Sequence, residues 1–540
     1  MFVDFNTVRD LWPELLLILL ASWIFLGGTI QASRAWWTGF SIASYCVAAY
    51  VIVWKEGPLW SDLDVVAILS GPIRVDFMGY VFRLSALLFG ILFTMVAART
   101  ARRDLSSEIL GTLMLLIVGL MLVARANDLV FLFVSLELIS IPTYVLLFLG
   151  RRDGSTAEAT IKYFFLSVLS SGLLLYGLSF LYGIAGTTTM IGTIDQPGIR
   201  DIGLGMLSQE GSDFRQMLAI PALVLLLAGL GFKIAAVPFH FYAPDVYEGT
   251  TNANAGLLAV IPKVAGILAL IRLVVIAFPI AATFAWQLCL VLAILTMSIG
   301  NVCALWQQNI RRLMAYSSVA HAGYLLIGLA VATAAAEIGT SQGGIAATLF
   351  YVFVYALASL GTFAALSFLG GKQRELSRVD ELAGLARIRP MTAAAIAVCM
   401  FSLAGIPPLA GFWGKLTLFL GAVDTATISA SANQPHLSAW FVVLAVAGAL
   451  NAAVAAAYYL RIIAVMYFGT STRSPQAEGG WGAWFAMSTC ALLVVALGVF
   501  PKTLLDTTMR SERSARAAAI SSMANSARES GPFDDVARAP

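Results

Sequence analysis

Four charged residues stand in the middle of long apolar runs, where charge is hardest to keep. They are one acid and three bases: Glu137, Lys233, Lys263 and Lys415. A charged side chain at the centre of a bilayer costs about 2.5–3.5 kcal/mol on insertion scales, so such residues usually serve a function. A buried lysine beside a protonatable carboxylate can load and release a proton. These residue types therefore predict proton transfer inside the apolar region.

A static ion pair that only fixes helix packing is the alternative for Glu137. Three lysines cannot all pair with one glutamate, so at least two of them must be neutral or solvated. Burial lowers the pKa of a lysine toward the range in which it exchanges protons, and a neighbouring carboxylate raises that pKa again. The imbalance favours a switchable proton store, and we expect Glu137 and Lys233 to approach within ion-pair or one-water distance.

Two histidines lie in or beside the apolar runs. His240 closely follows Lys233, and His321 lies in a later apolar run. Histidine titrates near neutral pH and can relay a proton. A buried histidine can equally well be a satisfied hydrogen-bonding group, so both interpretations stay open for each residue.

The apolar runs that carry these residues fill almost the whole chain. Of its 540 residues, 59% are hydrophobic and 12% are charged. A soluble domain carries about 25% charged residues, so this composition predicts an all-α polytopic membrane protein. Each spanning helix needs about 20 apolar residues. We expect fourteen spans, at 11–31, 36–54, 77–98, 105–124, 128–149, 158–185, 217–241, 252–276, 280–305, 313–332, 343–369, 391–420, 437–467 and 481–501.

Two of the expected spans are interrupted by proline. Pro238 follows Lys233 in the seventh span, and Pro407-Pro408 precede Lys415 in the twelfth. Proline removes a backbone donor and clashes with the preceding turn, so each helix should break there. Broken helices in corresponding positions of two halves are typical of inverted-repeat transporters. We expect helices 1–3 in residues 1–100, a first repeat in 101–278, an inverted second repeat in 279–469, and the last helix with a polar tail in 470–540.

Lysine and arginine are unevenly distributed between the expected loops. Loops after odd-numbered spans carry fourteen of them, and loops after even-numbered spans carry five. Positively charged loops stay in the cytoplasm, so both termini are expected on the outer face. The tail after Pro501 is rich in serine, alanine and arginine, and we expect it to be disordered or weakly helical at the surface.

Five other charges in apolar runs favour a structural interpretation. Arg83, Arg272 and Arg461 lie within a turn or two of expected span ends, so they can extend to the membrane surface. Glu14 suits the first turn of a helix, where a carboxylate is stabilised. Lys162 is also expected at the membrane surface.

The cysteines and the net charge exclude several kinds of function. Five cysteines lie in apolar stretches without the spacing of metal or cluster ligands, so we expect them to pack as small apolar side chains. A cysteine-held iron–sulfur cluster within this chain is thereby excluded. The net charge of +3 gives no indication of a nucleic-acid partner.

Three segments closely resemble the antiporter-like membrane subunits of respiratory complex I, the proton-pumping NADH:quinone oxidoreductase. They are Phe232–Gly249, Arg311–Tyr324 and Leu403–Lys415, and the resemblance covers about residues 100–470. Within this family, the run Pro244-Asp-Val-Tyr-Glu-Gly249 resembles the N type more than the L and M types. The long lateral C-terminal helix of the L type is not expected here.

The resemblance implies fourteen helices, two inverted five-helix repeats and a proton path. That path uses a glutamate of helix five and lysines of helices seven, eight and twelve, which match Glu137, Lys233, Lys263 and Lys415. A proton would enter from the cytoplasm near Lys233 and Lys263, pass to Lys415 and leave outward.

The resemblance also implies the surroundings of the chain. It would hold no cofactor, while FMN, iron–sulfur clusters and quinone would belong to partner subunits. Its partners would be other membrane subunits of the complex, especially the M and K types, in a bacterial cytoplasmic membrane. The loop Gly370–Arg389 is a candidate contact, although a solvated run of charge is equally compatible. The alternatives are a subunit of a cation/proton antiporter driven by an ion gradient, and a structural scaffold.

Overall fold

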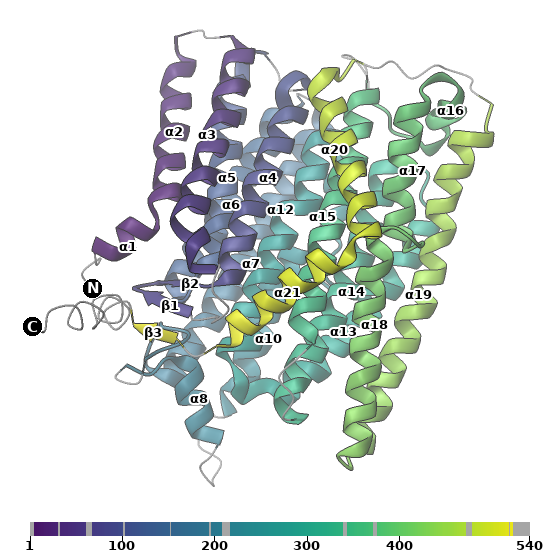
Figure 1. Cartoon of the computed structure of the whole chain (residues 1–540). Helices are drawn as coiled ribbons and strands as arrows, with labels where there is room; N and C mark the ends of the chain where they lie inside the picture. Colours follow the sequence, from purple (N-terminus) through teal and green to yellow (C-terminus); the bar gives the residue numbers. More distant parts are fainter. Residues whose placement is uncertain are drawn as a thin grey trace, which may run out of the picture.

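Long helices dominate the computed structural model, because a backbone that leaves water must satisfy its own hydrogen bonds. Figure 1 shows most of them running side by side in one bundle. Its first and last labelled elements, α1 and β3, lie on the same side of the bundle, away from α16. The structure describes residues 5–30, 33–60, 67–100, 103–151, 153–193, 196–207, 217–338, 343–370, 375–470, 478–517 and 519–521.

The helices fall into two groups, before and after the first break. The first group is α1 (Phe5–Asp10), α2 (Trp12–Gly28), α3 (Arg34–Glu56), η1 (Gly57–Trp60), α4 (Phe77–Thr100), η2 (Arg103–Leu105), α5 (Ser106–Arg125), α6 (Leu129–Gly150), α7 (Gly154–Ala185), α8 (Ile199–Leu207) and α10 (Ala219–Ile234). The second group is α11 (Tyr242–Gly249), α12 (Asn252–Leu270), the π-helical η3 (Ile271–Ala277), η4 (Pro279–Ala281), α13 (Ala282–Leu305), α14 (Ile310–Ile338), α15 (Gly344–Leu369), η5 (Val379–Leu382), α16 (Leu385–Ile388), α17 (Pro390–Ala404), α18 (Ala410–Ser431), α19 (Pro435–Phe468), α20 (Gly480–Val499) and α21 (Pro501–Arg516).

Eleven helices within the described ranges are long and apolar enough to cross a membrane, so the chain is a multi-pass membrane protein. Three shorter apolar helices, α2, α10 and α17, occupy the first, seventh and twelfth expected spans. Helix α10 stops short of the end of its expected span, and α17 ends midway through its own, because the chain breaks there. The predicted all-α membrane class is confirmed.

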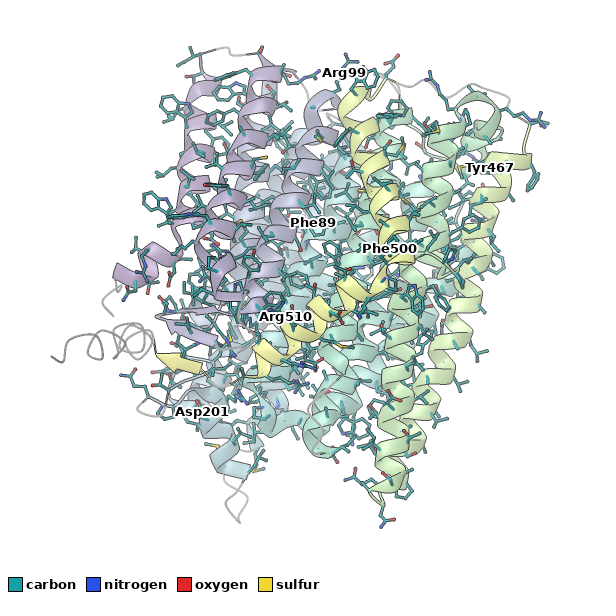
Figure 2. All side chains as sticks on the ribbon, viewed as in Figure 1. Phe89, Arg99, Asp201, Tyr467, Phe500 and Arg510 are labelled. Atoms are coloured by element: carbon teal, nitrogen blue, oxygen red, sulfur yellow. The ribbon has the colours of Figure 1, made fainter. Side chains whose placement is uncertain are left out.

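Successive loops lie at alternate ends of the bundle. Arg99 and Tyr467, which end the third and thirteenth expected spans, lie at one end in Figure 2, and Asp201 lies at the other. The helices α12, α14 and α15 are buried along almost their whole length. They therefore form the centre of the bundle.

Two aspartates set where the helices of the first half begin. Asp128 precedes α6 and accepts hydrogen bonds from the amides of Val130 and Phe131, at 2.9 and 3.0 Å. Asp153 precedes α7 and accepts from the amide of Thr156 at 2.8 Å. Such caps satisfy amides that have no partner within the helix. They hold α6 and α7 at the register that places Glu137 and its neighbours.

Both predicted helix breaks are present and have the same backbone geometry. α10 ends at Ile234 and is followed by Ala235 at φ 58°, while α17 ends at Ala404 and is followed by Gly405 at φ 89°. At each break the left-handed residue and the next one donate their amides back to the last helical turn, at 2.8–3.0 Å. This pattern closes a helix by satisfying its last carbonyls. The chain resumes in α11 and α18.

A small sheet covers the side on which the described chain begins and ends. β1 (Ala67–Ser70) pairs antiparallel with β2 (Ile73–Val75) and parallel with β3 (Ala519–Ser521). Ile68 aligns with Val75 on one side and with Ile520 on the other. The loop after α3 and the last described strand therefore lie on the same side.

Of the two alternatives expected for the tail, disorder is wrong for Pro501–Arg516, which form the helix α21. Figure 1 shows this helix running obliquely across the bundle from α20 toward β3, so a short lateral C-terminal helix is present. Its inward face is built from small and polar residues, among them Ser511, Glu512 and Ala515. That composition resembles disorder, which explains the error. The described tail residues after Ala517 are only the short strand β3.

Candidate proton-transfer site

Lys233 lies in the last turn of α10, just before the first break, and is almost fully buried. Its Nζ lies 3.9 Å from Oε1 of Glu137 on α6, and it donates a hydrogen bond to Oγ of Ser140. Ser171 on α7 donates to Glu137 Oε1 at 2.5 Å. The predicted ion-pair approach of Glu137 and Lys233 is confirmed, and three helices converge on it.

Glu137 itself lies at the edge of the bundle. Its side chain is 25% exposed, against 3% for Lys233. Val134 and Ile141, which precede and follow it on α6, face outward. The carboxylate therefore lies between the buried lysine and the outer surface of this chain.

Lys263 belongs to a second hydrogen-bonded group. It lies on α12, and its Nζ donates to the backbone carbonyl of Ser318 and, at 2.6 Å, to Oγ of the same serine on α14. The ammonium lies 4.7 Å from the centre of the Tyr355 ring, and the Tyr355 hydroxyl donates to Ser318 Oγ at 2.8 Å. A hydroxyl, a carbonyl and a ring face thus surround a lysine that has no carboxylate within ion-pair distance among the described residues.

His321 lies one turn after Ser318 on α14 and is buried among tyrosines. Nδ1 is 2.6 Å from the Tyr351 hydroxyl, and Nε2 is 2.8 Å from the Tyr459 hydroxyl. Its ring centre is 4.9 Å from that of Tyr355 and 5.8 Å from that of Tyr324. Both ring nitrogens therefore have hydroxyl partners, an arrangement that can pass a proton through the imidazole.

Lys415 lies on α18, after the second break. Its Nζ donates to the carbonyl of Ala404 at 2.9 Å, the last residue of α17. The ammonium lies 4.8 Å from the centre of the Tyr324 ring. The chain needs glycine at position 405, because a Cβ there would lie 2.9 Å from Cδ of Lys415 and φ is positive. The break therefore both exposes a carbonyl to the lysine and makes room for it.

The structure brings five of the six predicted residues into two arrangements, with His321 in the second. One holds Glu137 and Lys233. The other runs from Lys263 through Tyr355, His321 and Tyr324 to Lys415, by ring contacts and hydrogen bonds. Within the described residues, no side-chain hydrogen bond links the partners of Lys233 to those of Lys263.

His240 takes no part in either arrangement. It lies half-buried in the turn between α10 and α11. The hydrogen bonds that Lys233, Lys263 and Lys415 make with described residues do not involve it. Its predicted relay role stays a prediction, and His321 is better placed for that role.

Sequence reasoning missed the hydroxyl-bearing residues of the site. The spacing of several was informative: Ser140 lies one turn after Glu137, Ser318 one turn before His321, and Tyr351 one turn before Tyr355. Polar residues at these spacings in an apolar run share a helix face with the charge. Tyr324 likewise lies one turn after His321, whereas Tyr459 carries no such local signal, because it comes from a distant helix. The hydroxyl-bearing residues of the site are Ser140, Ser171, Ser318, Tyr324, Tyr351, Tyr355 and Tyr459.

Arg83 does not extend to the membrane surface, contrary to expectation. Its guanidinium is fully buried and donates to Glu14 at 2.6 and 3.0 Å and to Glu56 at 2.5 Å. Arg125 lies 3.5 Å from Glu56. Glu14 does lie in the first turn of α2, but its partner is this arginine of α4. The error arose because the sequence does not show which helices face each other.

Arg272 is buried as well, so the same expectation is wrong for it. It donates to Asp76 at 2.5 and 2.8 Å and to the carbonyl of Ala124 at 2.5 Å. Arg74 lies 3.3 Å from Asp76. Arg461 is partly buried and donates to the carbonyl of Leu305, which ends α13, and to that of Gln307 just after it. All three arginines join helices, which agrees with their structural interpretation.

The acids of the Pro244–Gly249 run bind basic residues of neighbouring helices. Asp245 lies 3.1 Å from Arg312 and 2.9 Å from Lys162, and Glu248 lies 2.9 Å from Arg312. Lys162 is 41% exposed, as expected at a membrane surface. The run therefore ties α11 to α7 and α14 beside the first break.

The fold and the lysine groups define a class of protein, a multi-pass membrane subunit with a broken helix in each half. The family described as NADH:quinone oxidoreductase/Mrp antiporter, TM matches residues 126–434, which include Glu137 and the three buried lysines. Respiratory complex I from Thermus thermophilus with bound aureothin contains a similar chain, with TM-score 0.73 and 28% identity over 92% of this chain and 99% of that one. The Mrp complex from Dietzia sp. DQ12-45-1b contains a chain of the same fold, with TM-score 0.75 and 20% identity over 93% of this chain and 97% of that one.

The sequence relatives identify the branch of this class. NADH-quinone oxidoreductase subunit N of Trichlorobacter lovleyi is 36% identical over 490 residues, which cover 90% of this chain and 92% of that protein. The chain belongs to the NADH-quinone oxidoreductase subunit N family.

Proposed function

We propose that this chain is a proton-translocating, non-redox membrane subunit of a proton-pumping NADH:quinone oxidoreductase. The observation that carries the proposal is the placement of three buried lysines in an apolar bundle, two of them beside helix breaks. Buried lysines are costly to insert, and each has partners that could hold or pass a proton. The names of the relatives support the same function.

The pair of Glu137 and Lys233 would act as the switchable element. When both are charged they attract, and Ser171 and Ser140 stabilise the two ends of the pair. When Glu137 gains a proton, Lys233 loses its counter-charge inside an apolar bundle and gives up its own proton more readily. A change at the exposed carboxylate would therefore change the charge of the buried lysine.

The second arrangement would carry the proton across the bundle. A proton taken up near Lys233 and Lys263 would pass by way of Ser318, Tyr355 and His321 toward Lys415. It would enter from the cytoplasmic side and leave on the outer side. Moving one charge against the membrane potential costs about 2.3 kcal/mol per 100 mV. Redox energy from elsewhere in the complex must supply that, so the chain acts as a coupled subunit and not as a separate enzyme.

The proposed membrane arrangement has fourteen crossings, with both termini outside. The three short apolar helices α2, α10 and α17 would be the remaining crossings, and α10 and α17 are short because each ends at a break. The matching geometry of the two breaks supports a pair of inverted five-helix repeats, α5–α12 and α13–α19. The concentration of lysine and arginine in odd-numbered loops supports a cytoplasmic location for that end of the bundle.

The proposed partners are other membrane subunits of the complex, particularly those of the M and K types. The partly exposed edge at Glu137, with apolar neighbours on α6 that face outward, supports a neighbouring subunit that packs side-on there. Electron transfer through FMN, iron–sulfur clusters and quinone is assigned to partner subunits. The location would be a bacterial cytoplasmic membrane.

A cation/proton antiporter subunit is the second candidate function. The fold of the Mrp chain is compatible with it, but at 20% identity that likeness concerns the fold alone. The relatives at 36% identity favour the redox-driven complex. A structural scaffold is the third candidate, and it requires the lysines to be dispensable.

The test is proton transport in inside-out membrane vesicles that contain the assembled complex. Lys415→Ala and Lys415→Arg should both lose NADH-driven acidification, because arginine keeps its charge but can hardly be deprotonated. Exchange of sodium for protons without NADH would support the antiporter. Normal pumping by both variants would support the scaffold and contradict the proposal.

A further inference from the structure

A separate group of polar residues lies at the start of α12, the helix that carries Lys263. The Glu375 carboxylate accepts hydrogen bonds from the Asn252 amide at 3.1 and 3.2 Å and from Arg311 Nη1 at 2.9 Å. The same nitrogen of Arg311 lies 3.4 Å from Asn252 Oδ1. The Glu375 side chain is 17% exposed. The carboxylate thus lies between solvent and the buried first turn of the helix.

The charges around Glu375 leave it able to take up a proton. Arg311 faces it at 2.9 Å and Arg151 at 3.8 Å, and Asp153 binds Arg151 at 2.8 Å. Burial raises the pKa of Glu375 above its usual value and outweighs the opposing effect of the Arg311 guanidinium. A carboxyl in this position holds a proton at higher pH than an exposed glutamate does.

Polar residues continue from this group toward Lys263 on two neighbouring helices. On α15, Tyr355, Ser359 and Thr362 follow one another at spacings of four and three residues, so they share one face. On α14, Ser318 lies seven residues after Arg311, two turns further along the same face. The side chains of these five residues are all buried. Ser318 and Tyr355 lie at the Lys263 end of these two faces, and Arg311 lies at the Glu375 end.

This polar stretch separates Asn252, which binds Glu375, from Lys263, which binds Ser318. Lys263 lies eleven residues after Asn252 on α12, a separation of about 16 Å along the helix axis. Tyr247 on α11 has its hydroxyl 3.5 Å from Ser318 Oγ, the acceptor of Lys263. A chain of water and hydroxyl groups of this length could conduct a proton between them.

Buried polar atoms without a partner indicate where such water would lie. Among the described residues, Thr250 Oγ1, Arg311 Nε and Ser367 Oγ are buried and have no hydrogen-bond partner. Thr250 lies two residues before Asn252, and Ser367 follows Leu366, whose carbonyl accepts from Asn252 Nδ2 at 3.3 Å. Buried polar groups of this kind are usually satisfied by ordered water. Water at these positions would surround the start of α12.

We propose that Glu375 is the surface acid that takes up protons for Lys263, an inference that rests on the function proposed above. A proton from water adds to the carboxylate and gives the neutral acid. The acid then releases that proton into the water and hydroxyl chain, and the Lys263 amine accepts it as ammonium. The carboxylate returns to its bonds with Asn252 and Arg311, ready for the next proton.

The experiment compares proton pumping by Glu375→Gln, Glu375→Asp and unchanged complex in inside-out vesicles. In these vesicles the cytoplasmic face is outward, so the pH of the outer buffer can be varied while the lumen is held constant. We expect Glu375→Gln to pump about tenfold more slowly at outer pH 8 and within about twofold of normal at pH 6, because hydronium then supplies the path directly. Glu375→Asp should keep most pumping at neutral pH. As the outer pH is raised, its pumping should fall at a lower pH than that of the unchanged complex.

The matched control is Asp380→Asn, which neutralises a 74%-exposed acid of the same loop. It should leave the dependence on outer pH unchanged. A pH profile of Glu375→Gln that coincides with that of the unchanged complex would overturn the proposal. Should Glu375→Gln fail to assemble, the profile of Glu375→Asp decides by the same criterion.

Lys263→Ala separates this inference from the function on which it rests. Loss of pumping in Lys263→Ala together with an unchanged pH profile in Glu375→Gln would contradict the role of Glu375 and leave the proposed function standing. Normal pumping in Lys263→Ala would contradict the proposed proton path itself, whatever the result for Glu375→Gln.

Discussion

The two helix breaks close in the same way but hold their lysines differently. At the first break, Lys233 lies before the interruption, 3.9 Å from the carboxylate of Glu137. At the second, Lys415 lies after the interruption and donates to the carbonyl of Ala404 at 2.9 Å. No carboxylate of the described residues lies within ion-pair distance of Lys415. One lysine therefore has a protonatable partner, and the other has the end of a helix.

This difference assigns different tasks to the two lysines. The carbonyls at the C-terminus of a helix carry a partial negative charge equivalent to about half an elementary charge. The end of α17 can thus stabilise an ammonium, but it cannot take up a proton and its field is constant. Glu137 can be neutralised, so its effect on Lys233 can be switched. The first break is suited to responding to a signal, and the second to receiving a proton.

The largest effect is expected from Lys233. Lys233→Ala removes the chargeable group and leaves Glu137 without its cation, and Lys233→Arg keeps a charge that cannot cycle. Both should lower proton pumping per assembled complex by about a hundredfold or more. The exposed Lys502→Ala is the control and should pump normally. Normal pumping by both Lys233 variants would contradict the switch at the first break.

Glu137→Gln tests whether the carboxylate is what distinguishes the first break. The amide keeps a hydrogen bond to Ser171 but cannot change its charge, so pumping should fall about tenfold, as expected for the loss of a charged hydrogen-bond partner. Glu158→Gln on α7 removes a largely exposed acid and serves as the control. Vesicle acidification and NADH oxidation, measured together, check this result. Equal effects of the two substitutions would show that Glu137 is only a surface acid.

Substitutions of Tyr324 test the ring contact of Lys415, which has a tyrosine ring beside it where Lys233 has a carboxylate. Tyr324→Leu removes the ring beneath the Lys415 ammonium, and pumping should fall about fivefold, because a buried cation–π contact is worth about 1 kcal/mol or more. Tyr324→Phe keeps the ring and should lose less. The exposed Tyr176→Leu is the control for loss of a tyrosine. A larger loss in Tyr324→Phe than in Tyr324→Leu would argue against the ring contact.

The smallest effect is expected from Ser140, the hydroxyl partner of Lys233. Ser140→Ala removes one neutral partner while Glu137 remains, so pumping should fall about threefold or less. Ser179→Ala on α7 removes an exposed hydroxyl and controls for the substitution. The initial rate of acidification per assembled complex is the measurement. A loss as large as that of Glu137→Gln would mean that the hydroxyl, and not the carboxylate, controls Lys233.

Much of the fold follows from local properties of the sequence. The length of each apolar run predicts a spanning helix, because the backbone must be satisfied within the segment. Pro238 and Pro407-Pro408 predict the breaks, because proline removes a donor wherever the helix lies. The cost of a buried charge singled out Glu137, Lys233, Lys263 and Lys415 before any contact was known.

The tertiary structure decided which of these residues meet and what surrounds them. Arg83 was expected at the membrane surface, but it is buried between two acids of other helices. The polar tail was expected to be disordered or weakly helical, but α21 is a helix of sixteen residues that packs across the bundle through small and polar residues. The tyrosines around His321 bring the consecutive helices α14 and α15 together with α19, which lies far from them in the sequence. Helix formation depends on neighbours along the chain, whereas these contacts depend on which faces of distant helices meet, and a single sequence does not contain that information.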